Sequence, residues 1–358
     1  MRAAVAYEAG KPLVIEDLPL PAVGPNDVVV RIAASGICHT DLAAIEGATP
    51  TPFPFVPGHE GCGVVEEVGA EVRRVKVGDR VLASVAPACG ECWWCVNSMS
   101  NLCDLGAEVK SALRWALPHG DRATSLCGCG TFAEVTVVHE ASVVPLETDL
   151  EDEELALLGC GVTTGLGAAL NTAKVTPGSS VAVIGCGGVG QSVIQGSRIA
   201  GAAVIVAVDP VASRRDTALA VGATHAVDPT TNNPLDEVRA LTGGRGVDYS
   251  FEVVGRMELI AQAYDMARRA GTVTLVGMPP LDGDLPLNAF RYVFSGKRLA
   301  GSVVGDAQIR RDFPRFVRLA ESGKLDLGSL VSSRIKLEQV NEGLAALDRV
   351  EGVRTVVV

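Results

Sequence analysis

The stretch at residues 181–209 constrains the fold more than any other part of this chain. It begins with the apolar run V-A-V-I, which leads directly into the turn G-C-G-G-V-G. Apolar residues without polar alternation are typical of a buried parallel strand. Gly185, Gly187 and Gly190 fit G-x-G-x-x-G, whose glycines permit a tight turn, close approach to a pyrophosphate and packing of helix on strand. The stretch predicts a nucleotide-binding strand, turn and helix; a glycine-rich turn without a ligand is the alternative.

A carboxylate follows at the distance that this motif requires. Residues 204–208 form a second apolar run, and Asp209 stands 19 residues after Gly190. An acid about 20 residues beyond the glycines accepts a hydrogen bond from a ribose 2′-hydroxyl in dinucleotide-binding folds. Such a carboxylate repels the 2′-phosphate of NADP. Asp209 therefore favours NAD, although Arg214 and Arg215 act against that preference.

Strands and helices alternate through the middle of the chain. Strands are expected at 181–185, 204–208, 225–227, 248–253, 272–277 and 298–304, and helices at 189–200, 213–221, 234–241 and 256–269. This alternation predicts a doubly wound parallel sheet with helices on both faces. Residues 1–150 show short apolar runs between Pro, Gly and Asp, which predict an irregular β-rich domain. Within them, 104–130 is expected to be a long loop, with Trp115 as a candidate pocket residue.

Composition and charge narrow the class of protein. The 358 residues suit two domains, and the net charge of -11 argues against a nucleic-acid partner. No uncharged apolar run reaches the roughly 20 residues of a membrane span, and the N-terminus lacks a secretory apolar core. We therefore expect a cytoplasmic protein without a membrane segment. In that compartment, its ten cysteines indicate metal ligation or catalysis before disulfides.

Four cysteines form a compact cluster in the sequence. Cys89, Cys92, Cys95 and Cys103 follow C-x2-C-x2-C-x7-C, which brings four thiolates within reach of one tetrahedral ion. Zinc in a closed, structural site is the expected occupant, and an iron–sulfur cluster is the alternative.

A second group of candidate ligands is spread along the chain. It contains Cys38 in G-I-C-H-T-D, His59 and Glu60 in P-G-H-E-G, and Cys160 in L-L-G-C-G-V-T-T-G. Each cysteine alone could be a small packing residue. Together, two thiolates and one imidazole suggest an open zinc site with a fourth position for water or substrate.

These motifs occur in the order and spacing of the zinc-dependent medium-chain alcohol dehydrogenases. The signature G-H-E-x2-G-x5-G at 58–69, the four-cysteine lobe and the glycine turn carry the resemblance, which runs from about residue 3 to the C-terminus. N-T-A-K-V-T-P-G and G-V-D-Y-S-F-E resemble the class III branch, the glutathione-dependent formaldehyde dehydrogenases. L-C-D-L-G and G-C-G-V-T-T-G resemble actinobacterial members of the aryl-alcohol and thiol-dependent formaldehyde type.

The resemblance implies an α/β protein in which a GroES-like β-rich catalytic domain is interrupted by a Rossmann domain. The expected bounds are 1–161 for the catalytic domain, 162–303 for the NAD-binding domain and 304–358 for the return to the catalytic domain. Nicotinamide would lie beside the open zinc in the cleft between the two domains. Two zinc ions per chain are implied, one catalytic and one structural.

The resemblance also implies a role for each site residue. Cys38, His59 and Cys160 would ligate the catalytic zinc, Asp41 would hydrogen-bond His59, and Glu60 would be an occasional exchange ligand. Thr40 would take the hydroxyl proton of the alcohol and pass it to the cofactor ribose. The residues expected to contact the cofactor are His39, Thr164, Gly185, Gly187, Gly188, Val189, Gly190, Asp209, Arg214 and Arg354.

Two departures from the family limit the choice of substrate. Ala43 replaces the histidine that ends the proton relay in many relatives, so the last step needs water or another group. The class III enzymes hold glutathione carboxylates with an arginine just past the cysteine lobe and use two acids in the loop before G-H-E. Those places hold Ala107, Thr49 and Thr51 here, which makes a glutathione adduct unfavourable. A substrate pocket bordered by Thr49, Val85 and Met278 would be apolar and of small to medium size.

The sequence thus predicts an NAD-dependent zinc alcohol dehydrogenase acting on primary or aryl alcohols and aldehydes. Three alternatives remain: a formaldehyde dehydrogenase for a non-glutathione thiol adduct of the mycothiol type, a nicotinoprotein that retains NAD, and a non-enzymatic zinc and nucleotide scaffold. The edge strand at 298–304 favours a homodimer, with a homotetramer as the other possibility.

Overall fold

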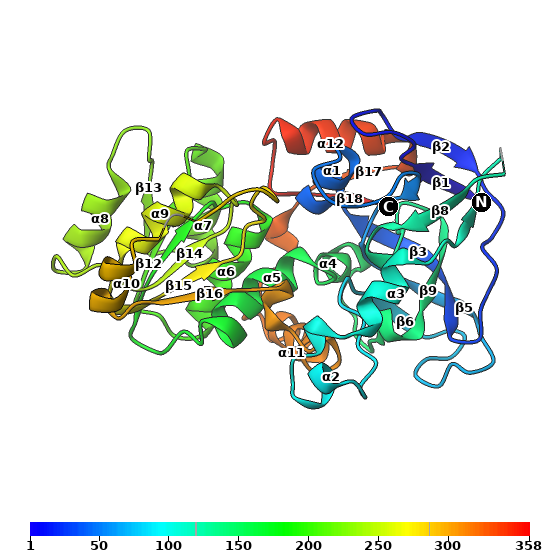
Figure 1. Cartoon of the computed structure of the whole chain (residues 1–358), viewed down its shortest axis with the longest axis horizontal. Helices are drawn as coiled ribbons and strands as arrows, with labels where there is room; N and C mark the ends of the chain where they lie inside the picture. Colours follow the sequence, from blue (N-terminus) through cyan, green and yellow to red (C-terminus); the bar gives the residue numbers. More distant parts are fainter. Residues whose placement is uncertain (119, 286) are drawn as a thin grey trace. The chain divides into compact units, whose positions relative to one another are not determined.

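The computed structural model describes residues 1–118, 120–285 and 287–358 (Figure 1). Within these residues the chain forms two compact units. The first comprises Met1–Gly161, Gln308–Gly323 and Leu327–Val358, and the second comprises Val162–Ala307 and Lys324–Asp326. The first unit is therefore assembled from both ends of the chain.

The first unit is built around a sheet with the strand order β10-β6-β5-β3-β18-β17, in which β9 also pairs with β3. Its strands are β3 (Asp27–Gly36), β5 (Glu60–Val68), β6 (Arg80–Ala83), β9 (Val135–His139), β10 (Val143–Pro145), β17 (Val331–Ile335) and β18 (Arg354–Val357). The C-terminal strand β18 pairs antiparallel with β3. Buried valines on these strands, among them Val28, Val30, Val65 and Val81, form a core under the sheet.

Shorter elements complete the first unit. Small sheets join β1 (Arg2–Val5) to β2 (Val14–Asp17), and β4 (Phe55–Val56) to β8 (Arg122–Ser125) and β7 (Trp115–Ala116). The helices are α1 (His39–Ile45), α2 (Trp93–Val96), α3 (Leu105–Ser111), α4 (Asp152–Leu157), α11 (Ile309–Glu321) and α12 (Val340–Asp348). Three acids in the first turn of α4 stabilise its N-terminus through the helix dipole.

The prediction of a long loop at 104–130 was wrong, because helix α3 and strands β7 and β8 lie within it. Trp115 is fully buried and packs with Val5 and Val56 in a core cluster. Its indole N–H donates to Ser125 Oγ at 2.9 Å. Arg114 donates to the Asp27 carboxylate at 2.7 Å. These long-range contacts order a segment whose local sequence has no clear periodicity.

The second unit contains a parallel sheet with the strand order β13-β12-β11-β14-β15-β16. The strands are β11 (Ser180–Ile184), β12 (Val204–Val208), β13 (His225–Val227), β14 (Val247–Glu252), β15 (Ala267–Leu275) and β16 (Arg298–Gly301). The chain runs outward from β11 to β13 and then returns to β14 beside β11. The switch point of the sheet therefore lies between β11 and β14, which is where ligands bind in such folds.

Helices cover both faces of this sheet, as predicted (Figure 1). The helices are α5 (Gly161–Gly167), α6 (Gly188–Ile199), α7 (Ala212–Val221), α8 (Pro234–Leu241), α9 (Met257–Met266) and α10 (Ala289–Ser295). Val181 and Val183 of β11 pack with α6 and α7, whereas Ala182 and Ile184 pack with α8 and α9. Asn233 caps the N-terminus of α8, since its side chain accepts a hydrogen bond from the Leu235 N–H. Pro234 then occupies the first helical position.

Two predicted boundaries in this unit were wrong. The helix expected at 256–269 ends at Met266, because Ala267 already pairs with Val247 of β14. Arg268 also donates to Asp248 at 2.6 Å, which holds this segment at the sheet. The last strand ends at Gly301 instead of residue 304, where a short 3-10 turn, Val304–Asp306, begins. Within the described residues, no helix combines the length and the apolar character needed to cross a membrane.

Candidate functional site

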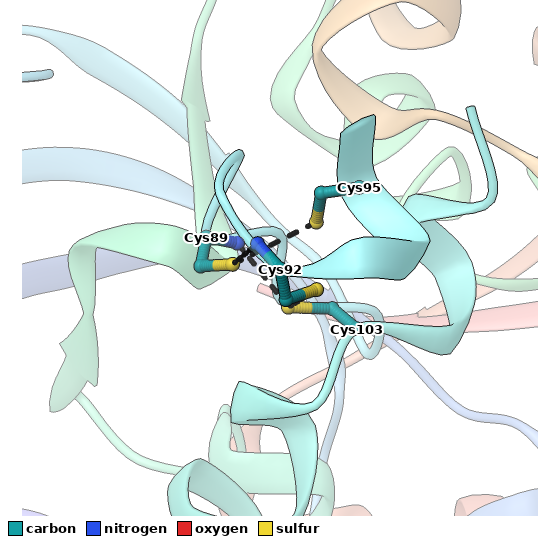
Figure 2. A group of neighbouring side chains, drawn as sticks. All are labelled: Cys89, Cys92, Cys95 and Cys103. Carbon is teal, nitrogen blue, oxygen red and sulfur yellow. Dashed lines mark hydrogen bonds between the residues drawn. The ribbon is translucent and has the colours of Figure 1, made fainter. Parts of the chain in front are cut away.

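The structure brings the four clustered cysteines together in the first unit. Cys89 lies in the loop before α2, Cys92 precedes that helix, Cys95 lies within it, and Cys103 follows the 3-10 turn Ser100–Leu102 (Figure 2). The Sγ atoms lie within 4.8 Å of one another. The distances from Cys89 to Cys95 and from Cys92 to Cys103 are both 3.8 Å.

This spacing fits one tetrahedral metal ion. Zinc–sulfur bonds of about 2.3 Å produce a tetrahedron whose edges are about 3.8 Å long. An iron–sulfur cluster would place more than one iron between the sulfurs and separate some of them further. Backbone N–H groups of Glu91 and Cys92 donate to Cys89 Sγ, each at 3.3 Å. Hydrogen bonds from the backbone lower the pKa of Cys92 to about 6, which favours a thiolate there.

The second ligand group comes from distant segments of the first unit; Cys38, His59 and Glu60 are buried, and Cys160 is partly exposed. Cys38 comes directly before α1, and Cys160 directly before α5. His59 comes directly before β5, and Glu60 is the first residue of that strand. One ligand atom from each of the four residues lies within 4.8 Å of those of the others. Cys160 lowers the pKa of Cys38 through a hydrogen bond, while its own pKa is raised well above the usual value. Two thiolates this close would repel each other, and a divalent cation between them would remove that repulsion.

The geometry of His59 is that of a metal ligand. Its Nδ1 lies 2.9 Å from Asp41 Oδ1, and both side chains are fully buried. Asp41 also accepts the N–H groups of Cys38 and Gly58, each at 2.9 Å. The other ring nitrogen, Nε2, is buried and has no hydrogen-bond partner among the described residues. A histidine whose one nitrogen is bonded to a carboxylate, with the other directed at thiols, has the arrangement of a metal ligand.

Glu60 is held by two partners. Its Oε1 accepts the Gly161 N–H at 2.9 Å, and its Oε2 pairs with Arg354. Arg354 begins β18 and is 6% exposed. The predicted exchange ligand and a predicted pyrophosphate-binding residue thus form one buried ion pair. The sequence did not predict this pair, because 294 residues separate the two partners.

The glycine turn has the predicted geometry in the second unit. Gly185 follows β11 with a φ of +91°, and α6 begins at Gly188. A Cβ at Gly190 would lie 1.9 Å from the Gly185 carbonyl oxygen, so helix and strand could not approach each other with a larger residue. At Gly187, an added Cβ would lie 3.8 Å from Arg214 Nη1, in ordinary van der Waals contact, so the Arg214 guanidinium borders the turn.

Asp209 connects this turn to the end of β12. Its Oδ2 accepts the Cys186 N–H at 2.8 Å, and its Oδ1 accepts the Val211 N–H at 2.8 Å. Each oxygen retains a further lone pair for a ligand hydroxyl. The Nε atom of Arg214 is buried and has no partner among the described residues. Arg215 instead pairs with Asp228 at 3.0 Å and donates to the Asp209 carbonyl.

The remaining predicted site residues are divided between the units. The first unit contains His39 and Thr40, which begin α1, and Val85, which is buried. It also contains Thr49, whose hydroxyl is hydrogen-bonded to that of Thr51 at 2.9 Å. Thr164 lies in α5, Gly188 and Val189 begin α6, and Met278 is 53% exposed, all in the second unit. Their roles in substrate and cofactor binding stay predictions.

Comparison with known proteins identifies the family of this chain. The description "Alcohol dehydrogenase GroES-like domain" matches residues 24–148, and "Zinc-binding dehydrogenase" matches residues 188–322. The chain belongs to the zinc-binding alcohol dehydrogenase family. The predictions of the family, of a GroES-like domain with a Rossmann-type parallel sheet, and of a zinc-dependent alcohol dehydrogenase are confirmed at this level.

Relatives cover the whole length of the chain. An S-(hydroxymethyl)glutathione dehydrogenase of Synechocystis is 36% identical, with 99% of each chain covered. An NDMA-dependent alcohol dehydrogenase of Amycolatopsis methanolica is 36% identical, over 99% of this chain and 98% of the relative.

Solved structures of the family have the same fold. The benzyl alcohol dehydrogenase of Acinetobacter calcoaceticus is 30% identical with a TM-score of 0.93, over 99% of this chain and 98% of the other. A zinc-binding dehydrogenase of Sinorhizobium meliloti, solved with NADP, is 26% identical with a TM-score of 0.83, over 100% and 98%.

Proposed function

We propose that this protein is a zinc-dependent alcohol dehydrogenase that transfers a hydride between a primary or aryl alcohol and NAD, reversibly. The observation that carries the proposal is the group of Cys38, His59 and Cys160, in which the buried His59 Nε2 lacks a partner among the described residues. A benzyl alcohol dehydrogenase among the similar structures supports the aryl substrate class.

Cys38, His59 and Cys160 would hold the catalytic zinc, with Glu60 beside it. Zinc bound there supplies a Lewis acid for the oxygen of an alcohol or aldehyde. Asp41 fixes the tautomer and the orientation of His59 through Nδ1. The Gly161 N–H and Arg354 hold the carboxylate of Glu60 in place. Thr40 takes the hydroxyl proton, and since Ala43 is not ionisable, water completes the path to solvent.

The cofactor is proposed to be NAD, held by the glycine turn and α6. A nicotinamide cofactor held there would supply the hydride acceptor of the reaction. The Asp209 carboxylate, 3% exposed, stands at the end of β12 and favours an unsubstituted ribose. Arg214 lies beside the turn and would contact the ribose or a phosphate. The NADP-bound relative makes NADP the comparison cofactor for any assay.

The stoichiometry, assembly and location are part of the same proposal. Each chain would hold two zinc ions, the second in the four-cysteine lobe. A homodimer is supported by exposed apolar side chains of α10, which lies next to the edge strand β16: Phe290 is 70%, Val293 70% and Phe294 65% exposed. We place the protein in the cytoplasm, since all ten of its cysteines are described and free. The domain bounds 1–161, 162–303 and 304–358 remain as proposed from the sequence.

Two relatives favour alternative reactions of the same site. The S-(hydroxymethyl)glutathione dehydrogenase supports oxidation of a thiol adduct, although Thr49, Thr51 and Ala107 argue for a thiol other than glutathione. The NDMA-dependent relative supports a nicotinoprotein with retained NAD.

One substrate screen tests the proposal. Zinc-loaded protein is incubated with NAD or NADP, with primary and aryl alcohols, and with formaldehyde plus mycothiol or glutathione. Reduction of NAD with benzyl alcohol in the absence of thiol is the expected result. Strict dependence on mycothiol, or turnover only with NDMA and with NAD retained after gel filtration, would select an alternative. No cofactor reduction under any condition would contradict the proposal.

A further inference from the structure

Glu252 is a buried acid at the carboxyl edge of the parallel sheet, and neither the zinc sites nor the glycine motif accounts for it. It is the last residue of β14 and is fully buried. β14 lies next to β11, so Glu252 stands at the switch point, one strand away from the glycine turn. A buried carboxyl group there needs a physical reason.

Two loops are attached to this residue. Its side-chain Oε1 accepts the N–H groups of Val254 and Gly255, at 2.9 and 2.8 Å. Its main-chain carbonyl accepts those of Val276 and Gly277, at 2.9 and 3.1 Å. A Cβ at Gly277 would lie 2.1 Å from Gly255 N, which shows that the two loops touch through their backbones. Glu252 thus fixes the 253–255 loop against the 276–278 loop.

The 253–255 loop borders the glycine turn. The Val253 N–H donates to the Ile184 carbonyl at the end of β11, at 3.0 Å. A Cβ at Gly185 would lie 2.5 Å from Val254 Cγ2, so the valine side chain covers the first glycine of the turn. Val254 is nevertheless 46% exposed. An exposed valine beside a nucleotide turn presents an apolar wall to whatever the turn binds.

Burying the Glu252 carboxylate costs free energy, and the hydrogen bonds from the loop offset only part of that cost. Burial raises the pKa of Glu252, and the N–H donors of the loop act against that shift. The second oxygen, Oε2, is buried and has no partner among the described residues.

We propose that Glu252 is a positioning residue of the dinucleotide site, holding the 253–255 loop so that Val254 forms one wall for the bound cofactor. The inference rests on the proposed use of NAD. It predicts that disturbing Glu252 weakens cofactor binding while the chemical step at saturating cofactor is preserved.

The test uses three variants of the full-length, zinc-loaded protein, with the NAD dissociation constant measured by calorimetry and kcat and KM measured separately. Glu252→Ala should raise the Kd and KM for NAD about tenfold or more and change kcat less than about twofold. Glu252→Gln retains a carbonyl oxygen for both loop N–H groups and should restore most of the affinity. Val254→Ala, at an exposed position that does not threaten folding, should raise KM in the same direction.

Thr274→Val is the matched control, because Thr274 is a fully buried residue of the adjacent strand whose hydroxyl also has no partner among the described residues. It should leave the KM for NAD unchanged. A folded Glu252→Ala with the wild-type KM, an unaffected Val254→Ala, or an equal rise in KM in Thr274→Val would overturn the positioning role. If the wild-type protein binds NAD but oxidises no alcohol, the proposed reaction is contradicted. The role of Glu252 is then decided by the NAD dissociation constants of the variants alone. Wild-type protein that binds no dinucleotide contradicts both.

Discussion

The two sulfur-rich clusters of the first unit differ in how the chain assembles them. All four ligands of the lobe lie between Cys89 and Cys103, and three of the four are partly exposed. The ligands of the second cluster extend from Cys38 to Cys160, and Cys38, His59 and Glu60 are buried. The first cluster offers four equal sulfurs and no carboxylate. The second includes an imidazole, a carboxylate and two thiols, tied to Asp41, Gly161 and Arg354.

This difference favours a structural metal in the four-cysteine lobe and a catalytic metal in the second cluster. Four thiolates complete a tetrahedron and leave no position for substrate, whereas three ligands leave one position open. Removing a ligand should therefore affect stability in the lobe and turnover in the buried cluster.

Cys160→Ala should reduce alcohol turnover about 10³-fold or more, since Lewis-acid activation contributes several kcal/mol and each 1.4 kcal/mol is about tenfold in rate. The protein should stay folded and hold one zinc per chain. Cys62→Ala is the matched control, because Cys62 is a buried cysteine outside both clusters whose pKa is raised to about 12 by burial. Steady-state kinetics and metal analysis check both variants. Wild-type turnover in Cys160→Ala would contradict the catalytic role.

Cys95→Ala should lower the melting temperature by about 5–10 °C, because metal binding in a segment without its own core is folding free energy. Turnover per folded molecule should change much less than in Cys160→Ala. The neighbouring Val96→Ala, at a side chain that is 64% exposed, should melt close to the wild type. Calorimetry provides the comparison, and an unchanged melt in Cys95→Ala would remove the structural role of the lobe.

Asp41→Asn should weaken zinc binding in the buried cluster about 10–100-fold, since the carboxylate that orients His59 is lost. Competition with a chelator at fixed pH measures this affinity. Asp27→Asn replaces a buried acid that pairs with Arg114 instead of a histidine. It should cost stability without changing zinc affinity, and equal zinc loss in both variants would contradict an orienting role for Asp41.

Arg74→Met should lower the melting temperature by about 2–4 °C, because hydrogen bonds from a charged group are worth about 1.5–3 kcal/mol. Arg74 donates to the carbonyl oxygens of Ala88 and Cys89, at 3.0 and 2.6 Å, which anchors the base of the lobe. Arg73→Met, at the exposed neighbouring position, is the control. A melt of Arg74→Met equal to that of Arg73→Met would show that the lobe needs no such anchor.

The sequence predicts the local features of this molecule better than the long-range ones. The glycine turn, the alternation of strands and helices from 181 onward, and the cysteine spacing at 89–103 each depend on neighbours in sequence. The order at 104–130 does not, because Trp115 and Arg114 are ordered by contacts with Ser125 and Asp27. The prediction of a helix through residue 269 failed for a related reason. Ala267 pairs with β14, although the local sequence favours a longer helix.

The same limit applies to the candidate sites. Cys38, His59 and Cys160 could be grouped because each lies in a motif that resembles a known family. The ion pair of Glu60 with Arg354 and the loop contacts of Glu252 have no sequence signature. They depend on strands β18 and β14 being placed beside β3 and β11.

If the two clusters hold two zinc ions with separate roles, a chelator titration should remove them with different effects. Zinc content, turnover and melting temperature are followed on the same samples. Loss of one zinc should abolish turnover with little change in melting temperature, and the other zinc should leave only as the protein loses stability. Full turnover after the first zinc has left, or simultaneous loss of zinc, activity and fold, would contradict separate roles for the two ions.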